Sequence, residues 1–484
     1  MNRLSLLWMM PLLGAAFVAL AGLAGRRAPR VIAAIFSVWH LALVLHVAHP
    51  ILTGAATCLD ASGPTWAFGI SYQLSCDALS MSLVGLTAFL TLVCVVASWN
   101  NDVGAGYWVA FLALSSALCG VFLARDLFLF YVFWEATLIP MFFIIGIWGS
   151  ANRRHAAIKF FLFTFGGSIL MLLALLALVG AHAHSTGEWT WDLAKISAAG
   201  LSEAAAPWVF IGLLLGFAVK IPVVPLHTWL PDAHTEAPAA GSVMLAGVML
   251  KMGVYGIMRI AIPLFPELAW SWLPWLGGLA AVNAIWGALC AMAQADLKRL
   301  IAYSSIAHLG FCLLGVLSRT THGLAGGALQ LLNHGITTGA LFLLVGFLYD
   351  RAHVRGRSQF GDLVNRAPML TFFFGFATLA SIGLPGLNGF VGELLALSGI
   401  AQVMPPLAWL GCLGVTLAAA YALPAFQEVF WGAAGPDSRS SLVTDLTGRE
   451  RAILWVLSAL MLAIGLSPGR LLEILSPALT GLVR

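Results

Sequence analysis

The chain has 484 residues, of which 61% are hydrophobic and only 9% are charged, and its formal net charge is +4. A soluble domain carries about 25% charged residues, so the composition excludes a soluble globular protein and indicates a polytopic membrane protein. There is no basic run for nucleic acid and no Walker A or Rossmann phosphate-binding motif. The seven cysteines lack the close spacing of iron–sulfur ligands, so we expect no cofactor in this chain.

Apolar segments follow one another along almost the whole chain. At about 20 residues per span, we predict about 14 transmembrane helices. They run near 5–25, 31–49, 77–98, 107–123, 126–148, 157–180, 207–230, 237–262, 271–293, 300–317, 323–348, 367–400, 402–431 and 452–472. Because each segment is long and continuous, the expected fold is all-α, a helix bundle and not a barrel. The long apolar N-terminus suits a first span better than a signal peptide.

Lysine and arginine are distributed unevenly between the loops. Most of the 24 basic residues follow odd-numbered spans: Arg26, Arg27, Arg30, Arg153, Arg154, Lys159, Lys298, Arg299, Arg351, Arg355, Arg357, Arg366, Arg439, Arg449 and Arg451. The other side holds Arg3, Arg125, Lys195, Arg259, Arg319, Arg470 and Arg484. Since basic loops stay in the cytoplasm, both termini are predicted to lie outside it, and the number of spans is predicted to be even.

Two spans contain helix breakers near their middle. Pro222 and Pro225 interrupt the seventh, and Gly383, Pro385, Gly386 and Gly389 interrupt the twelfth. Paired interruptions five spans apart predict two inverted repeats of five helices. We therefore expect a single integral membrane domain over 1–484, with spans 1–3 in 1–106, a first repeat in 107–262, a second in 271–431 and a last span at 452–472.

Ionisable residues lie inside several predicted spans: Glu135, Lys220, Lys251 and Glu393. At about 3 kcal/mol each, four unpaired charges would cost roughly 12 kcal/mol, which rivals the whole stability of a domain. The lysines lie too deep to reach an interface, and Glu135 could alternatively be neutralised by a proton or one hydrogen bond. A paired or hydrated line of such groups predicts a conduction path, with Glu135 paired to Lys220.

Two histidines extend this polar line. His308 and His334 lie in the tenth and eleventh spans, near serine, threonine and asparagine side chains. Each alone could be a hydrogen-bonded core residue, but together they are candidates for a proton relay. In HTWLPDAHTEAP, His227, Asp232, His234 and Glu236 could suggest a metal site; two prolines intervene, so we interpret the stretch as a connector that caps the next helix.

Several of these segments carry a family resemblance. PLHTWLPDAHTEAPAAGSVMLAGVMLKMGVYGIMR, KRLIAYSSIAHLGF, LNHGITTGALFLLVGFLYDR and GLPGLNGFVGE resemble the proton-conducting, antiporter-like membrane subunits of respiratory complex I and of multi-subunit cation/proton antiporters. The resemblance extends from about residue 75 to 470. Glu393, where related subunits typically have lysine, and the short stretch after span 14 are typical of the M-type subunits of NADH:quinone oxidoreductase.

The resemblance implies a role for each of these residues. Glu135 corresponds to the channel glutamate, Lys220 to the lysine that it modulates and Lys251 to the central relay lysine; His308 and His334 correspond to further relay groups and Glu393 to the exit-side carboxylate. It also implies a proton-translocating subunit in a bacterial inner membrane, beside other antiporter-like chains, with flavin, iron–sulfur clusters and quinone on partner subunits. The alternatives are a subunit of a cation/proton antiporter or of a membrane-bound hydrogenase or formate hydrogenlyase, a passive scaffold, or a solute carrier.

Overall fold

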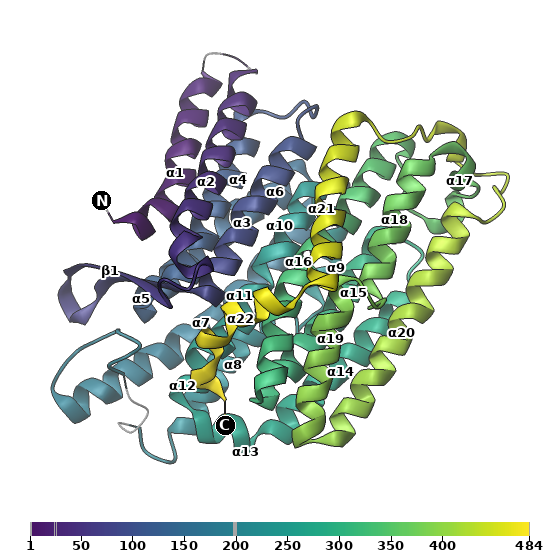
Figure 1. Cartoon of the computed structure of the whole chain (residues 1–484). Helices are drawn as coiled ribbons and strands as arrows, with labels where there is room; N and C mark the ends of the chain where they lie inside the picture. Colours follow the sequence, from purple (N-terminus) through teal and green to yellow (C-terminus); the bar gives the residue numbers. More distant parts are fainter. Residues whose placement is uncertain (1, 24, 26, 197–200, 484) are drawn as a thin grey trace.

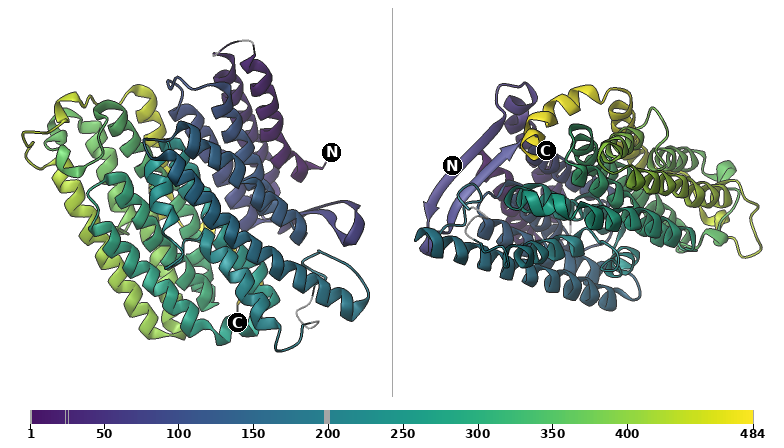
Figure 2. Two further views of the ribbon diagram at one scale, coloured as in Figure 1. Left: turned by 180° about the vertical axis from the view of Figure 1, so that it is seen from behind. Right: turned by 90° about the horizontal axis from the view of Figure 1, so that it is seen from below.

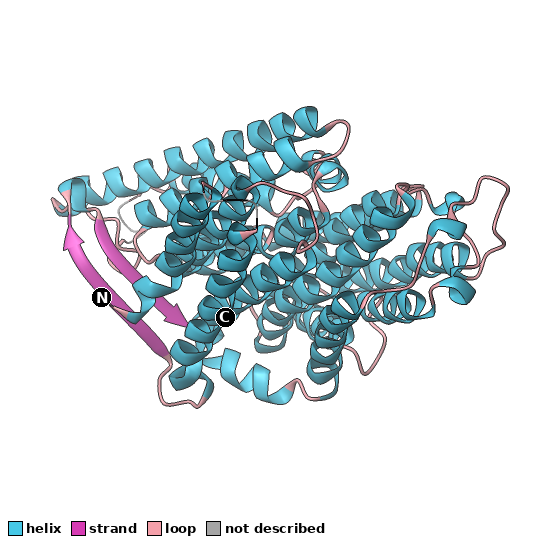
Figure 3. Ribbon diagram, turned by 90° about the horizontal axis from the view of Figure 1, so that it is seen from above, coloured by secondary structure: helices cyan, strands magenta, loops and turns pink. Residues whose placement is uncertain are grey.

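The computed structural model describes residues 2–23, 25, 27–196 and 201–483; Arg26 and Arg484 of the charge pattern lie outside these ranges. Within them, the chain folds as a bundle of helices with one two-stranded hairpin at its edge (Figures 1 and 3). The predicted polytopic helical architecture is therefore confirmed.

Eleven helical stretches among the described residues are long and apolar enough to cross a membrane, or twelve if a bent C-terminal pair counts as one. They are α1 (Arg3–Gly22), α2 (Ala28–Leu52), α3 (Ala78–Ala97), α4 (Ala105–Leu123), α5 with α6 (Leu127–Ala136, Leu138–Trp148), α7 (Arg153–Thr186), α10 to α12 (Ala239–Leu264), α14 (Leu273–Met292), α15 (Leu297–Ser318), α16 (Thr321–Ala352) and α20 (Pro405–Phe430). The pair is α21 (Gly448–Leu466) and α22 (Gly469–Leu479). Two broken spans, described below, complete the predicted set of about 14.

Short elements connect these spans. They are the single helical turns η1 (Ala67–Gly69), η5 (Arg357–Gln359), η6 (Ser440–Leu442) and η7 (Thr480–Leu482), and the short helices α13 (Pro266–Ser271) and α17 (Leu363–Arg366). The hairpin, β1 (Cys58–Thr65) and β2 (Ser71–Asp77), joins spans 2 and 3 and departs from the all-helical expectation. Its second strand is tied to the bundle because Asp126, the N-cap of α5, accepts hydrogen bonds from the backbone and hydroxyl of Ser71.

The helices differ sharply in the share of their residues that is buried inside the bundle. The apolar part of α16 is buried throughout, and α10 to α12 and α15 nearly so. In contrast, only about a third of the apolar part of α1, α2 and α20 is buried, and Phe17, Trp39 and Trp409 lie on the outside. Figure 2 shows α1 and α2 at the opposite end of the elongated bundle from α20. An apolar surface needs an apolar surrounding, so the outer helices suit lipid and the inner ones can carry polar groups.

The seventh span is broken as predicted. Helix α8 (Ala206–Lys220) ends at Lys220, and α9 (Trp229–Glu236) begins after a turn that contains Pro222 and Pro225. A break in apolar surroundings leaves backbone groups that need partners. The amide of Asn283 in α14 supplies one partner, accepting from Val224 N at 2.8 Å, and it also donates to Ile306 O in α15 at 3.1 Å.

The twelfth span is also broken as predicted. Helix α18 (Pro368–Ser381) ends before the glycine-rich turn, and α19 (Asn388–Val403) follows it. Gly383 and Gly386 have positive φ values of 76° and 94°, a conformation that glycine adopts without steric cost. The two breaks agree with the inverted-repeat architecture, while the division of the chain into residues 107–262 and 271–431 stays a prediction.

Three further interruptions escaped the sequence analysis. The backbone hydrogen-bond pattern of the fifth span is interrupted at Thr137, two residues after Glu135, because Pro140 lacks a backbone donor, although Thr137 keeps helical dihedral angles. The eighth contains two π-helical turns, η3 (Leu245–Met249) and η4 (Ile257–Ala261), on either side of α11 (Lys251–Gly256). The segment predicted at 452–472 is not one straight helix, since α21 and α22 meet at 76°.

Candidate functional site

Buried polar side chains form a row through the core of the bundle. The six predicted residues come from six elements: Glu135 from α5, Lys220 from the end of α8, Lys251 from the start of α11, His308 from α15, His334 from α16 and Glu393 from α19. Lys220, Lys251, His308, His334 and Glu393 are all buried. The structure joins four of the six into two contacting pairs, and leaves Glu135 and Lys220 apart.

The first pair consists of His308 and Glu393. His308 Nδ1 lies 3.0 Å from Glu393 Oε1, and the other ring nitrogen lies 3.1 Å from Ser381 Oγ. Gln330 donates a further hydrogen bond to the same carboxyl oxygen at 3.2 Å. The carboxyl of Glu393 is therefore held by neighbours on α15 and α16 and does not face lipid.

The second pair consists of Lys251 and His334. Lys251 Nζ lies 2.6 Å from His334 Nδ1 and also donates a hydrogen bond to the carbonyl of Ala246. That carbonyl belongs to the π-helical turn η3, directly before Lys251. A π turn widens a helix and often marks a functional position, and here it helps hold the amine against the imidazole.

The two pairs meet at the histidines. The rings of His308 and His334 lie 5.8 Å apart, and His334 Nε2 is buried without a hydrogen-bond partner among the described residues. Both histidines line a cavity of about 10 Å³ together with Thr337 and Ser381. A cavity needs roughly 10–15 Å³ to hold one water molecule, so this space matches a single water between the rings.

Lys220 and Glu135 do not form the predicted contact. No ion pair within 4.0 Å joins them in the described part of the chain, where Lys220 Nζ also has no hydrogen-bond partner. The ammonium instead lies 5.5 Å from the ring centre of Trp134 and 5.8 Å from that of Phe160. Glu135 still interacts electrostatically with Lys220, and the hydroxyls of Tyr131 and Ser168 lie beside its carboxyl.

Amide side chains complete the surroundings of Glu393: Asn333 belongs to the predicted polar line, whereas the sequence analysis missed Gln330 and Asn388. Asn333 donates to Gln330 Oε1 at 3.2 Å and to the carbonyl of Asn388 at 2.7 Å. The amide of Asn388 in turn bonds the hydroxyl of Thr337. A signal existed, because an amide within an apolar span is rare and has to find a partner.

His234 was interpreted as part of a connector, but it lies inside the bundle. It belongs to α9 and is fully buried, and its ring stacks on Phe342 with centroids 4.6 Å apart. Neither ring nitrogen has a hydrogen-bond partner among the described residues. Asp232, from the same stretch, bonds Lys159 at 2.6 Å, and no group of three or more metal-ligating side chains was found among those residues.

Comparisons with known proteins agree on the family. The family described as "NADH:quinone oxidoreductase/Mrp antiporter, TM" matches residues 124–418. NADH-quinone oxidoreductase subunit M of Rhodobacter capsulatus is 42% identical over 428 residues, covering 87% of this chain and 83% of the relative. NADH-ubiquinone oxidoreductase chain 4 of Arabidopsis thaliana is 40% identical over 418 residues, covering 86% and 83%.

Solved structures share the same fold. A chain of respiratory complex I from Thermus thermophilus with bound NADH superimposes with a TM-score of 0.88 at 34% identity, covering 99% of this chain and 100% of that one. A chain of the Mrp complex from Dietzia sp. DQ12-45-1b gives 0.86 at 23% identity, covering 100% and 98%, which shows the fold alone. Together with the matched family and the relatives above, these likenesses show that the chain belongs to the NADH:quinone oxidoreductase/Mrp antiporter family of membrane subunits.

Proposed function

We propose that this chain is a proton-translocating membrane subunit of an NADH:quinone oxidoreductase, and that Glu135, Lys220, Lys251, His334, His308 and Glu393 carry the protons. The observation that carries this proposal is the buried row from Lys251 to Glu393. Its two hydrogen-bonded pairs meet at a cavity the size of one water. Buried ionisable groups are costly in a membrane, and a merely structural role would not require them to lie end to end.

Each contact in the row suits one proton transfer. The ammonium of Lys251 gives a proton to His334 Nδ1, 2.6 Å away. His334 then releases a proton from Nε2 through one water to His308, and His308 delivers a proton to the carboxylate of Glu393, 3.0 Å away. An imidazole accepts a proton on one nitrogen and releases one from the other, so it relays charge without leaving its place.

Lys220 is the group that loads this row, and Glu135 controls it. A charge nearby changes the free energy of protonating an amine, and Lys220 has no hydrogen-bond partner among the described residues that would mask this effect. A movement of α5 driven by a neighbouring subunit would change the distance between the carboxyl and the amine. That change would let Lys220 pass its proton on or take one up.

The other parts of the enzyme lie on partner chains. We assign flavin, iron–sulfur clusters and quinone to those subunits, and neighbouring antiporter-like chains and membrane lipid to the surroundings of this one. We assign the chain to a bacterial inner membrane, as for the bacterial relatives, and the charge pattern supports both termini outside the cytoplasm. Protons would then enter from the side of the basic loops and leave near Glu393.

The test uses the assembled complex in inverted membrane vesicles. Lys220→Ala and Glu135→Ala are expected to abolish most NADH-driven acidification while the complex still assembles, as judged on native gels. Glu428→Gln, at a half-exposed carboxylate paired with Arg357, is the control and keeps full pumping. Full pumping and full coupled NADH oxidation in both alanine variants would contradict the proposal.

The antiporter alternative has weaker support. The Mrp chain is 23% identical to this one, against 42% for the Rhodobacter capsulatus subunit M. Vesicles containing the complex separate the two, since an antiporter would exchange sodium for protons without NADH.

A further inference from the structure

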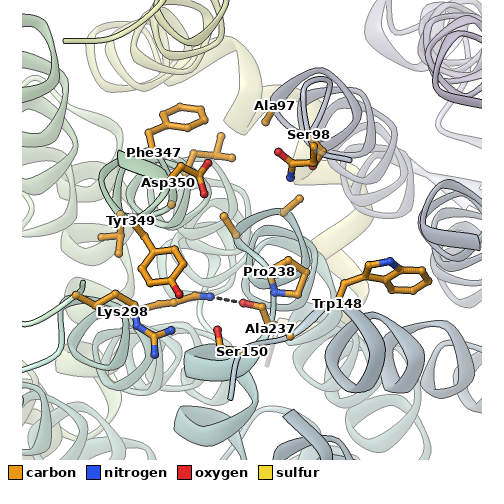
Figure 4. Close-up of a pocket in the computed structure, with 18 of the residues that line it drawn as sticks. Ala97, Ser98, Trp148, Ser150, Ala237, Pro238, Lys298, Phe347, Tyr349 and Asp350 are labelled. Atoms are coloured by element: carbon orange, nitrogen blue, oxygen red, sulfur yellow. Dashed lines mark hydrogen bonds between the residues drawn. The ribbon is translucent and has the colours of Figure 1, made fainter. Parts of the chain in front are cut away.

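Two small cavities lie beside the row of relay residues, and one side chain lines both. The much larger cavity in Figure 4, of about 290 Å³, lies among the ends of α3, α15 and α16, and none of the six proposed relay residues lines it. In contrast, His308 and His334 line the cavity of about 10 Å³, and Ser381 lines both this cavity and a further one of about 30 Å³. This further cavity, which we call the Tyr421 cavity, lies between α15, α16, α18 and α20.

The Tyr421 cavity has hydroxyl groups on its wall, in otherwise apolar surroundings. They come from Ser304 in α15, Thr378 and Ser381 in α18, and Tyr421 in α20. A buried water molecule needs roughly 10–15 Å³ and two to four polar partners. The Tyr421 cavity therefore has both the volume and the polar groups to hold at least one water.

The hydroxyl of Tyr421 is the group on this wall that the proposed proton row does not explain. Tyr421 is only 3% exposed, and its hydroxyl oxygen is buried without a hydrogen-bond partner among the described residues. The hydroxyl of Ser304 is nearby without forming such a bond, and it donates instead to the carbonyl of Ile301 at 2.8 Å. A buried hydroxyl without a partner is costly, and a water in the cavity would remove this cost.

Ser381 connects the Tyr421 cavity to the relay. Its Oγ lies 3.1 Å from His308 Nε2, while Glu393 Oε1 lies 3.0 Å from the other ring nitrogen, Nδ1. In a neutral imidazole one nitrogen donates and the other accepts. If Ser381 donates to Nε2, the ring proton of His308 lies on Nδ1 and points to Glu393. A serine hydroxyl has one proton and two lone pairs, so Ser381 can donate to His308 and still accept from a water in each cavity.

We infer that the Tyr421 cavity holds an ordered water, and that Tyr421 is a positioning residue that sets the tautomer of His308 through this water and Ser381. Tyr421 donates to the water, the water donates to Ser381, and Ser381 donates to Nε2. A proton arriving from the water in the smaller cavity then binds Ser381 Oγ while the serine gives its own proton to Nε2, and the Nδ1 proton passes to Glu393. Only O–H and N–H bonds form and break. The inference rests on the proposed function and deepens it, because it adds a residue that directs the last transfer.

Tyr421→Phe in the assembled complex removes the hydroxyl and keeps the ring. We expect NADH-driven acidification of inverted vesicles to fall about fivefold, the scale of one lost hydrogen bond, with no rise in the melting temperature of the complex. A dry, unpartnered hydroxyl predicts the opposite: its removal would raise the melting temperature and leave pumping at the parent rate, and this result overturns the inference. Tyr72→Phe is the matched control. The Tyr72 hydroxyl bonds Trp8 and Ser5 near the N-terminus, so this variant should lower the melting temperature and keep pumping.

A double-variant cycle separates positioning from a general structural effect. Ser381→Ala removes the link to His308, so Tyr421→Phe should cause no further loss of pumping in that background, whereas independent effects would multiply. Multiplied losses would overturn the inference. Density for a water between the hydroxyls of Tyr421 and Ser381, in a map of the complex that resolves other buried waters, supports the inference, and an empty cavity in such a map overturns it.

Lys220→Ala, measured in parallel, distinguishes failure of this inference from failure of the proposed function. If Lys220→Ala fails to pump while Tyr421→Phe pumps at the parent rate, the role of Tyr421 is wrong and the proposed function stands. If Lys220→Ala also pumps normally, the proposed function itself is overturned.

Discussion

Lys251 and His334 are 83 positions apart in the sequence, yet Lys251 Nζ lies 2.6 Å from His334 Nδ1 in the buried centre of the bundle. Three features create this contact. The π-helical turn η3 supplies the carbonyl of Ala246 to the ammonium, and α16 carries the imidazole. Because the apolar part of α16 is buried throughout, lipid does not reach the pair. The contact is the shortest in the proposed proton row.

Replacing Lys251 by Met keeps the length and apolar stem of the side chain and removes the amine. We expect the complex to assemble and the rate of NADH-driven acidification to fall by about 100-fold. A loss of this size is typical when an acid–base group is removed. The acidification rate in inverted vesicles measures the effect. An arginine at this position would keep the charge but hold its proton permanently, so Lys251→Arg should fail as well; pumping by either variant at the parent rate would contradict a relay.

Glu393→Gln preserves the shape of the side chain and its contact with Gln330 but removes the proton acceptor next to His308. Coupled NADH oxidation should fall at least about tenfold, since removing a general base typically costs more than this. Assembly should be unaffected, because an amide can still bond to its neighbours. Glu428→Gln again serves as the control, and equal losses in the two variants would point to a non-specific effect.

Asn283→Leu removes the amide that links Val224 N, in the break of the seventh span, to Ile306 O in α15. Val224 N loses this partner, and a buried group left without a partner costs about 1–3 kcal/mol, so the free energy of unfolding should fall by about that amount. A lower melting temperature of the detergent-solubilised complex measures this loss. Leu279→Ala, on the exposed side of the same helix, should change it little; an unchanged melting temperature in Asn283→Leu would show that the break needs no such support.

Gly326→Ala tests the close approach of α16 and α19. A Cβ at Gly326 would lie 2.3 Å from the backbone nitrogen of Ala396, so the helices must separate, at about 1–3 kcal/mol for such overpacking. Because Gln330 and Glu393 sit on these two helices, their hydrogen bond should lengthen and pumping should fall together with stability. Gly278→Ala on α14 has nothing within 4 Å of the new Cβ, and it should behave like the parent in both measurements.

The two pair contacts show what could and could not be predicted from the sequence. A charge in an apolar run is visible without a structure, because its cost in lipid is large, and this marked Glu135, Lys220, Lys251 and Glu393. Which charge meets which partner was not visible. The expected contact between Glu135 and Lys220 is absent among the described residues, and Trp134 and Phe160 surround the lysine instead.

The burial of His234 could not be predicted from the sequence either. Prolines and polar residues around it favoured a connector, because loops are normally polar and lie at the surface. The structure places the stretch in a short buried helix, where Phe342 stacks on the imidazole. Its burial comes from α16, which lies far along the chain, so no local pattern could have indicated it.

The sequence by itself determined that this is a helical membrane protein, about where its spans run, where its two main breaks fall and which side chains are too costly to be incidental. These features depend on composition, on the 20-residue length of a span and on the backbone chemistry of proline and glycine, all of which are local. Only the tertiary structure decided that Lys251 meets His334 and that His308 meets Glu393. These arrangements arise from the packing of helices distant in sequence, where a shift of one residue along a helix turns a side chain by about 100° and replaces one neighbour with another.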